Sequence, residues 1–244
     1  MKLILFDVDG TLIDSQAIIH ESMRQTFLHF GYSEPELEST KSIIGLTLDR
    51  AIATILQRNI DDEVLAMTAE YKDAYVALAQ KDEMQSMPFH GIPGLIHRLS
   101  NRSDITLGVV TGKSRRGVQR LFQTTHFVDR FTVSRCADDC PSKPHPAMVR
   151  ECCEEIGISP FNTVVIGDTG FDMEMAKSAG ANSIGVSWGY HPVERIYSAG
   201  AEQVVHSVSS LEDALFSFLG PMKNTVEVPR TVTSFASFGS LQNA

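Results

Sequence analysis

The 244-residue sequence has no long apolar run and little cysteine. No stretch approaches the roughly 18 consecutive apolar residues of a membrane-spanning helix, so we expect no membrane partner. The apolar segment at 1–6 is too short for the apolar region of a secretory signal peptide, and we therefore expect a cytoplasmic protein. The 4 cysteines all lie within 136–153 and include an adjacent pair, which is a poor basis for a disulfide framework.

The sequence also lacks an excess of positive charge. Its formal net charge is −9, and the acidic residues are spread along the chain instead of forming a tail. This balance argues against a surface that binds a nucleic-acid backbone, so we expect no nucleic-acid partner. Hydrophobic residues make up 43% of the chain, enough to bury a core in one large domain or two smaller ones.

One group of residues invites interpretation as a zinc site. Cys136, Cys140 and His145 are close in sequence, but the usual two-residue spacing between cysteine ligands is absent. We interpret them as ordinary small buried or loop residues.

Continuous apolar runs ending in polar or glycine residues occur at four places. They are KLILFDVDGT (2–11), ITLGVVTGKS (105–114), NTVVIGDTG (162–170) and NSIGVSWG (182–189). Runs without polar alternation are typical of strands buried on both faces, as in a parallel sheet covered by helices. Helical patterns follow at 93–102, 114–125 and 145–157. The sequence therefore predicts an α/β fold with a doubly wound, Rossmann-like parallel sheet.

A different pattern separates the first run from the others. Residues 15–86 contain amphipathic helical segments and no convincing strand, which predicts an inserted helical cap domain. The return passage at 87–94 holds two prolines and two glycines and suits a hinge. We therefore expect an α/β core over 1–14 and 87–220, a helical cap over 15–86, and a loosely held C-terminal tail over 221–244.

The ends of the predicted strands carry the chemistry, because ligands of open α/β sheets bind outside the carboxyl ends of the strands. These ends bring together Asp7, Asp9, Gly10, Thr11, Thr111, Gly112, Lys113, Lys143, Gly167, Asp168 and Asp172. Four carboxylates in one crevice repel one another and require a cation, and oxygen ligands favour magnesium over zinc. Lys143, the Thr111 hydroxyl and the turn amides around Gly112 supply charge and donors for an anion.

These stretches together resemble the four ordered motifs of the haloacid dehalogenase superfamily. The matching stretches are DVDGT (7–11), VVTGKS (109–114), Lys143 in PSKPHP, and GDTGFDMEMAKSAG (167–180). The resemblance covers residue 1 to about 190, with the insertion where that superfamily places its first type of cap. Within the superfamily the chain is most similar to the phosphoglycolate phosphatase group, also through SWGY (187–190).

The resemblance implies a phosphatase acting on a small phosphorylated metabolite, with the chain a monomer or homodimer. Asp7 attacks phosphorus to form an aspartyl-phosphate, and Asp9 protonates the leaving oxygen and later activates water. Mg²⁺ is the implied cofactor, bound by the Asp7 carboxylate, the Asp9 main-chain carbonyl, Asp168 and Asp172. Thr111, Gly112 and Lys143 hold the phosphoryl oxygens. 2-Phosphoglycolate is the implied substrate, and another small phosphate ester, pyrophosphate, or a phosphomutase reaction are the alternatives.

Asp9 favours phosphate-ester chemistry, because dehalogenating members have a tyrosine at this place and phosphonate-cleaving members an alanine. Two rival interpretations fit less well. A nucleotide-binding phosphate loop needs a glycine at 107, where Leu107 stands. A receiver module that accepts a phosphoryl group has no place for the helical insertion and does not split its acids between the first strand and residues 168–172.

The cap residues that read the substrate are harder to assign. Helix periodicity breaks at Gly45, which suggests that Gly45–Leu48 faces the site, although a simple helix connection is an equal alternative. Lys41 and Arg50 are the nearest cations for a substrate carboxylate. Trp188 follows a strand end and either lines the crevice or packs in the core. We do not expect His90 or His191 in the site.

Overall fold

A computed structural model of the chain describes residues 1–125, 127 and 129–220; the tail predicted over 221–244 lies outside the described residues. Six parallel strands form one sheet in the order β5-β4-β1-β6-β7-β8. The strands are β1 (Lys2–Phe6), β4 (Ile105–Val110), β5 (Val133–Arg135), β6 (Thr163–Gly167), β7 (Asn182–Val186) and β8 (Gln203–Val205). Along the chain, β4 and β5 are added on one side of β1, and β6, β7 and β8 are then added on the other side. This reversal confirms the predicted doubly wound α/β fold.

Strand β1 lies between β4 and β6 and is buried on both faces of the sheet. Ile4 and Phe6 join one hydrophobic cluster, and Leu3 and Leu5 join another on the opposite face. Successive side chains of a strand point to opposite faces, so an unbroken apolar run supplies two cores at once.

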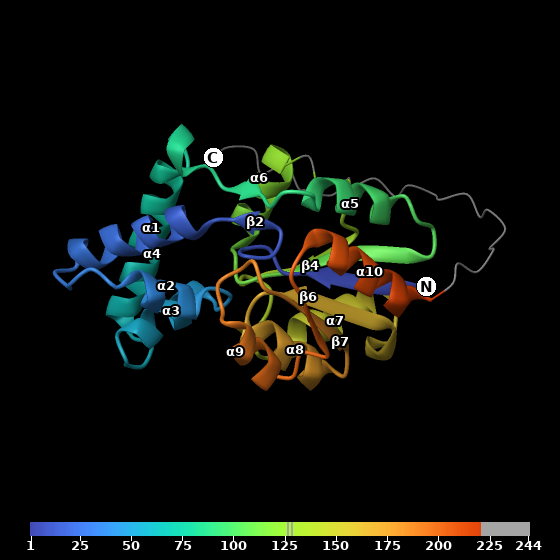
Figure 1. Cartoon of the computed structure of the whole chain (residues 1–244). Coiled ribbons are helices and arrows are strands. Elements are labelled where there is room, and N and C mark those ends of the chain that lie inside the picture. The colour runs from blue at the N-terminus through green and yellow to red at the C-terminus, as the bar shows by residue number, and fades with distance from the viewer. Residues whose placement is uncertain (126, 128, 221–244) are drawn as a thin grey trace, which may run out of the picture.

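Helices cover both faces of this sheet (Figure 1). On one face, α5 (Ile92–Ser100), α6 (Arg115–Thr125) and α10 (Val208–Leu219) contribute to the cluster that contains Phe6. On the other face, α7 (Ala147–Ile156) and α8 (Gly170–Ala179) contribute to the cluster that contains Leu5. The remaining elements of this part are α9 (Val193–Ser198) and the short turn η2 (Pro160–Asn162).

Four helices lie beside the carboxyl ends of the strands, at the left of Figure 1. They are α1 (Gln16–His29), α2 (Leu37–Ile43), α3 (Leu48–Ile55) and α4 (Asp62–Leu78). Met23, Ile52 and Met67 are buried in a hydrophobic cluster of their own. The stretch from 15 to 86 thus has its own core, apart from the two that flank the sheet; we call these four helices the cap.

The two chain crossings between cap and sheet run side by side. The first is β2 (Ile13–Asp14), and the second is β3 (Met87–Pro88), which follows the turn η1 (Asp82–Met84). The two strands pair antiparallel, with Ile13 opposite Pro88 and Asp14 opposite Met87. The segment that the sequence suggests as a hinge therefore forms a two-stranded ribbon with the outgoing crossing.

The sequence predicts several of the long helices, but the 12-residue helix α10 and the shortest elements have no prediction. Helices α5, α6 and α7 fall within two residues of the predicted ranges at each end. The seven-residue helix α2 and the three-residue strands β5 and β8 are too short to establish a period, which is why no prediction covers them. No helix in the described part of the chain is long and apolar enough to cross a membrane.

His191 links the cap to the sheet domain, although the sequence gives no reason to single it out. Its Nδ1 accepts a hydrogen bond from the Gly170 N–H at 3.0 Å, and its Nε2 lies 3.2 Å from the Ser42 carbonyl oxygen in the cap. This pair of partners requires a neutral ring with the proton on Nε2. Burial, with a contribution from the Arg195 guanidinium, lowers the pKa of His191 to about 4.

We predict that His191 makes the protein less stable in acid. A folded-state pKa below the ordinary value of 6.5 means that the unfolded chain binds the proton first, so stability is lost as pH falls from about 6.5 to 4. The loss reaches at most about 3 kcal/mol. Urea unfolding at pH 7 and pH 4.5 measures it, and His191→Gln should show a smaller difference than wild type. His90→Gln, at an exposed histidine, is the matched control; equal pH dependence in both variants would contradict the prediction.

Candidate functional site

A fully buried lysine joins two carboxylates at the carboxyl ends of the strands. The Lys143 Nζ lies 2.7 Å from Asp7 Oδ1 and 2.6 Å from Asp172 Oδ1, and all three side chains are at most 1% exposed. Asp7 directly follows β1, and Asp172 lies in the first turn of α8. The residues that the sequence places at separate strand ends are thus brought into contact.

The position of Asp172 is determined by its own helix. Its Oδ2 accepts hydrogen bonds from the Thr169 hydroxyl at 2.6 Å and the Thr169 N–H at 3.1 Å, while Thr169 caps the Asp172 N–H in return. This reciprocal capping box starts helix α8 and leaves Asp172 Oδ1 for Lys143.

Asp168 completes the acidic group. Its Oδ1 accepts a hydrogen bond from the Thr11 hydroxyl at 2.8 Å, and its Oδ2 accepts one from the Tyr190 N–H at 2.9 Å. Gly10 passes very close: a Cβ there would lie 2.2 Å from Asp168 Oδ2, and its φ of +86° is a conformation that favours glycine. A side chain at position 10 would displace the carboxylate.

The electrostatics of this group favour a cation. Burial raises the pKa of Asp7 to about 7, against the opposing effect of Lys143, and Asp172 and Asp9 raise it further. Burial, with the charges of Asp7 and Asp172, also raises the pKa of Asp168 well above its ordinary value. Lys143 is held charged, because the attraction of Asp172 and Asp7 outweighs the effect of burial and raises its pKa. A single lysine therefore does not neutralise the three acids.

The residues present fit a hard divalent cation. Asp7, Asp168 and Asp172 each offer an oxygen within 4.8 Å of the others, and they are the described residues that group in this way. Asp7 Oδ2 is buried and has no hydrogen-bond partner among the described residues. Carboxylate oxygens are the ligands that magnesium prefers. The Asp9 side chain lies outside this group.

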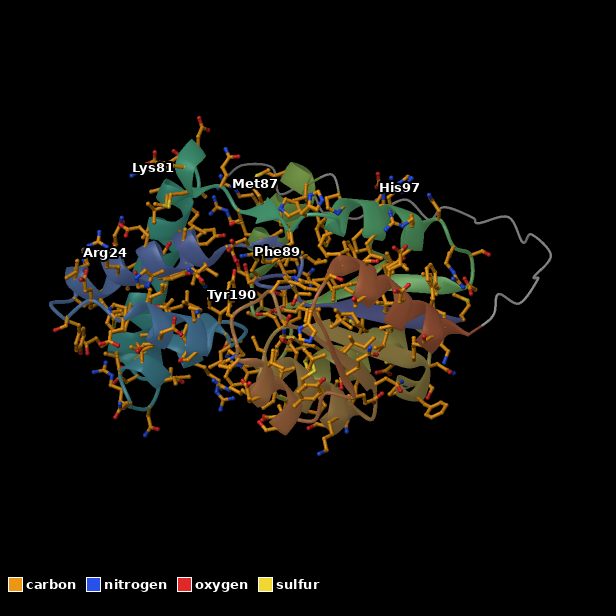
Figure 2. All side chains as sticks on the ribbon, in the orientation of Figure 1. Arg24, Lys81, Met87, Phe89, His97 and Tyr190 are labelled. Carbon is orange, nitrogen blue, oxygen red and sulfur yellow. The ribbon has the colours of Figure 1, made fainter. Side chains whose placement is uncertain are left out.

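Asp9 has separate partners that connect it to the cap. It accepts a hydrogen bond from the Ser15 hydroxyl and forms an ion pair with the Lys113 Nζ at 2.7 Å. The same Nζ lies 3.4 Å from the hydroxyl of Tyr75 in helix α4. Tyr190 lies between cap and sheet domain in Figure 2. Its hydroxyl accepts a hydrogen bond from the Ser15 N–H at 2.9 Å.

Thr111 and Gly112, the other two predicted phosphate-binding residues, line the same pocket as Asp7. Thr111, fully buried after β4, accepts a hydrogen bond from the Lys113 N–H at 3.2 Å. Gly112 lies directly below the cap loop: a Cβ there would be 2.5 Å from the Leu46 carbonyl oxygen. The loop at 45–48 is pinned further by the Thr47 N–H, which donates to the Ser142 hydroxyl at 2.9 Å.

A cleft of about 950 Å³ opens between cap and sheet domain, and Asp7, Asp9 and Thr111 lie in its wall. Gly45, Leu46, Thr47 and Leu48 also line it, as the break in helix periodicity suggests. Lys41 and Arg50, the sequence-based candidates for a substrate carboxylate, do not line the cleft, and Lys41 pairs with Glu38 at 2.9 Å. Trp188 packs against the sheet core and donates to the Thr11 carbonyl at 3.2 Å.

Several residues of the site were not singled out from the sequence. They are Ser15, Thr169 and Tyr190. Thr11 and Lys113, which the sequence places at the ends of the first two predicted strands, contact Asp168 and Asp9 in the site. Tyr190 acts through its backbone N–H toward Asp168, for which no sequence signal exists.

Comparison with known proteins assigns a family. Residues 4–186 match the model of the haloacid dehalogenase-like hydrolases. An N-acetylmuramic acid 6-phosphate phosphatase of Pseudomonas aeruginosa is 28% identical over 221 residues, covering 88% of this chain and 95% of that protein. A phosphoglycolate phosphatase of Chromobacterium violaceum is 27% identical over 221 residues, covering 88% and 96%.

Solved structures agree at the level of the fold. A haloacid dehalogenase-like family protein of Streptococcus pneumoniae superimposes with a TM-score of 0.75 at 24% identity, covering 88% of this chain and 98% of that one. The family model spans three quarters of the sequence and includes both ends of the acidic site, from Asp7 to Asp172. The chain therefore belongs to the haloacid dehalogenase-like hydrolases.

Proposed function

We propose that the protein hydrolyses a small phosphate monoester with the help of Mg²⁺, through an aspartyl-phosphate on Asp7. The observation that carries the proposal is the buried group of Asp7, Asp168 and Asp172 around Lys143, in which one Asp7 oxygen has no partner among the described residues. A carboxylate with a free oxygen at the floor of a cleft is suited to attack an electrophile that enters there.

Asp7 and Asp9 divide the chemistry between them. Asp7 Oδ2 is the attacking atom, while Lys143 holds Oδ1 at 2.7 Å and so fixes the direction of the other oxygen. Asp9 is the acid and base: it donates a proton to the departing oxygen and then takes one from the water that attacks the aspartyl-phosphate. Its ion pair with Lys113 at 2.7 Å suits the second step, in which Asp9 must be charged.

The remaining residues stabilise charge. The Thr111 hydroxyl, the Gly112 N–H and the Lys143 ammonium hold the phosphoryl oxygens. Asp7, Asp168, Asp172 and the Asp9 carbonyl are the proposed ligands of Mg²⁺. When bound, the ion offsets the repulsion between these carboxylates and the phosphate dianion.

For the substrate, the sequence resemblance supports 2-phosphoglycolate first. The related proteins support the wider class of small phosphorylated metabolites, since one is named for phosphoglycolate and another for N-acetylmuramic acid 6-phosphate. Pyrophosphate hydrolysis and a phosphomutase reaction use the same core residues and remain the alternatives. We also propose a cytoplasmic location and a monomer or homodimer.

The first prediction concerns the nucleophile. Asp7→Asn keeps the size of the side chain and removes its charge, so the rate of phosphate release from 2-phosphoglycolate or p-nitrophenyl phosphate should fall more than about a thousandfold. Release of inorganic phosphate at 5 mM Mg²⁺ is the measurement. Asp213→Asn, at an exposed aspartate on α10, should retain wild-type rates. Activity of Asp7→Asn above a few per cent would assign the attack to another group.

The second prediction concerns the metal. Magnesium binds the folded acidic group and not the unfolded chain, so saturating Mg²⁺ at about 100 times its Kd should add about 2.7 kcal/mol of stability, or roughly 5 to 10 °C in Tm. Thermal unfolding in EDTA and in Mg²⁺ measures this without any substrate. Asp168→Asn should lose most of the shift, while Glu174→Gln, exposed on the same helix as Asp172, should keep it. An equal shift in Asp168→Asn would remove Asp168 from the ligand set.

A further inference from the structure

Tyr190 contacts the acidic site, the first chain crossing to the cap, and the core of the cap. It ends the stretch SWGY (187–190), which follows β7. Its N–H donates a hydrogen bond to Asp168 Oδ2 at 2.9 Å, and its hydroxyl accepts one from the Ser15 N–H at 2.9 Å. Its ring packs among the buried residues of the cap, and only 7% of the residue is exposed. One residue thus joins a candidate metal ligand, the crossing and the cap.

Ser15 departs from the usual role of a serine at its place in a helix. It is the N-cap of α1, where a serine hydroxyl ordinarily accepts a hydrogen bond from an N–H of the first turn. The Ser15 side chain forms no such cap. Its hydroxyl donates instead to Asp9 Oδ1, while its own N–H donates to the Tyr190 hydroxyl. The Ser15 hydroxyl therefore serves the proposed acid and base and not its own helix.

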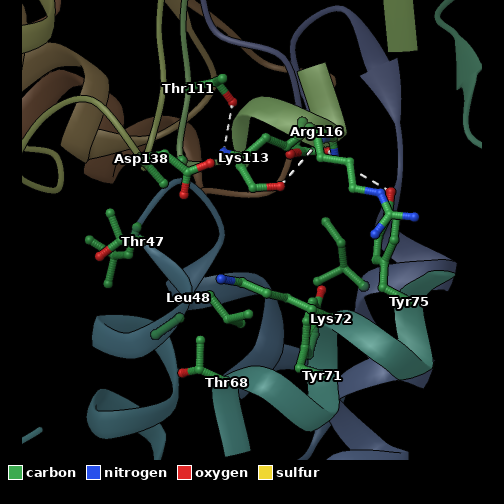
Figure 3. Close-up of a pocket in the computed structure, with 18 of the residues that line it drawn as sticks. Thr47, Leu48, Thr68, Tyr71, Lys72, Tyr75, Thr111, Lys113, Arg116 and Asp138 are labelled. Carbon is green, nitrogen blue, oxygen red and sulfur yellow. Dashed lines mark hydrogen bonds and ion pairs between the residues drawn. The ribbon is translucent and has the colours of Figure 1, made fainter. Parts of the chain in front are cut away.

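The Asp9 carboxylate is held through one of its two oxygens. Oδ1 contacts the Ser15 hydroxyl and, at 2.7 Å, the Lys113 Nζ from the loop after β4. Figure 3 shows Lys113 and Thr111 together on the sheet side of the cleft, across from Tyr71 of α4. Asp9 lines the cleft, and its Oδ2 has no hydrogen-bond partner among the described residues. The carboxylate is thus fixed through Oδ1 and leaves Oδ2 for a bound ester.

The Tyr190 hydroxyl determines where the Ser15 hydroxyl lies. Besides accepting the Ser15 N–H, it lies 3.4 Å from Ser15 Oγ and 3.4 Å from Asp14 Oδ1. A buried N–H without an acceptor is unfavourable, so loss of the Tyr190 hydroxyl favours movement of the Ser15 backbone toward another partner. Such a movement carries the Ser15 hydroxyl away from Asp9. The direction of the Asp9 carboxylate therefore depends on Tyr190.

We propose that Tyr190 is a positioning residue for Asp9 and that it acts through Ser15. The Tyr190 hydroxyl fixes the Ser15 backbone, and the Ser15 hydroxyl fixes Asp9 Oδ1, so that Oδ2 meets the oxygen that leaves phosphorus. The inference rests on the proposed phosphatase activity and deepens it by naming a residue whose side chain acts on the acid and base from outside the reaction.

Tyr190→Phe isolates the hydroxyl, because it keeps the ring in the cap and the backbone N–H on Asp168. When Asp7 attacks, the bond between phosphorus and the ester oxygen breaks, and Asp9 gives its proton to that oxygen. An alkoxide needs this proton, whereas p-nitrophenolate is a stable anion that leaves without it. Alkyl and nitrophenyl esters therefore respond differently when Asp9 loses its position.

The measured quantity is kcat/KM, which reports the steps up to formation of the aspartyl-phosphate. In Tyr190→Phe it should fall at least about tenfold for an alkyl ester and change less than about twofold for p-nitrophenyl phosphate. The alkyl ester is whichever of 2-phosphoglycolate, glycerol 3-phosphate and glucose 6-phosphate the wild type hydrolyses fastest. The ratio of the two esters is taken within one variant, so a smaller folded fraction cancels. Tyr197→Phe, at an exposed tyrosine of α9, is the matched control and should keep the wild-type ratio.

A second variant tests the route from Tyr190 to Asp9. Ser15→Ala should also lower kcat/KM for the alkyl ester alone. Combined with Tyr190→Phe, it should be no slower than the slower single variant, because both changes act on the same Asp9 oxygen. The inference is overturned by an equal loss for both esters, by losses that multiply in the double variant, or by an unchanged ratio in Tyr190→Phe.

Magnesium binding separates this role from an effect on Asp168. Thermal unfolding in EDTA and in Mg²⁺ should give Tyr190→Phe the wild-type shift in Tm, because the N–H on Asp168 is retained. A lost shift would assign the effect to the metal site and overturn the route through Ser15. The proposed function fails separately, if the wild type releases phosphate from none of these esters. Normal wild-type turnover, with the same ratio of esters in Tyr190→Phe, overturns the positioning role alone.

Discussion

The buried ammonium of Lys143 is the contact on which the site depends. Removing an ion from water costs several kcal/mol, and the cost is offset only if its partners are close and correctly directed. Lys143 meets Asp7 and Asp172 at 2.7 and 2.6 Å. Asp7 follows the end of β1, and Asp172 lies in the first turn of α8, the helix that follows β6. The parallel pairing of β1 with β6 brings the end of β1 next to the end of β6, from which the chain leads into α8. The contact of Lys143 with both acids therefore depends on the register of the sheet.

Around this contact, each acid is oriented by a different kind of group. Asp172 is held by the cap of its own helix, and Asp168 by a hydroxyl and a backbone N–H from two separate loops. Because the residues that hold these acids, Thr11, Thr169 and Tyr190, are themselves buried, the carboxylates have little freedom to move apart. Such fixed groups need no rearrangement when charge develops on a phosphoryl group, which is the usual origin of electrostatic catalysis.

The core residues of the site could be predicted because each follows an apolar run that is itself a local signal. Asp7 ends the run of β1, Thr111 that of β4 and Asp168 that of β6, and the parallel sheet brings such ends together. The proposed roles of these residues came from the resemblance and not from the runs.

The cap side could not be predicted in the same way. Lys41 and Arg50 are close in sequence to the loop at 45–48, but their helices direct them away from the cleft lining, whereas Lys72 reaches it from α4. Helical periodicity tells which residues share a face but not which face meets the sheet domain. Tyr190 and Ser15 meet across 175 residues of chain, a contact that only the folded structure specifies.

The ribbon formed by β2 and β3 makes the cap a replaceable module. Both chain crossings lie next to each other and pair over two residues, so the covalent connection between the cap and the rest of the protein is confined to one narrow ribbon. A domain connected in this way can open and close by rotating about the ribbon as about a hinge. Among the described residues, the hydrophobic cluster of the cap takes only Tyr190 from the sheet domain, so substitutions on α1 to α4 away from Tyr190 leave the packing around β1 intact. Substitutions in the cap can therefore change the lining of the cleft while Asp7, Asp168 and Asp172 keep their positions.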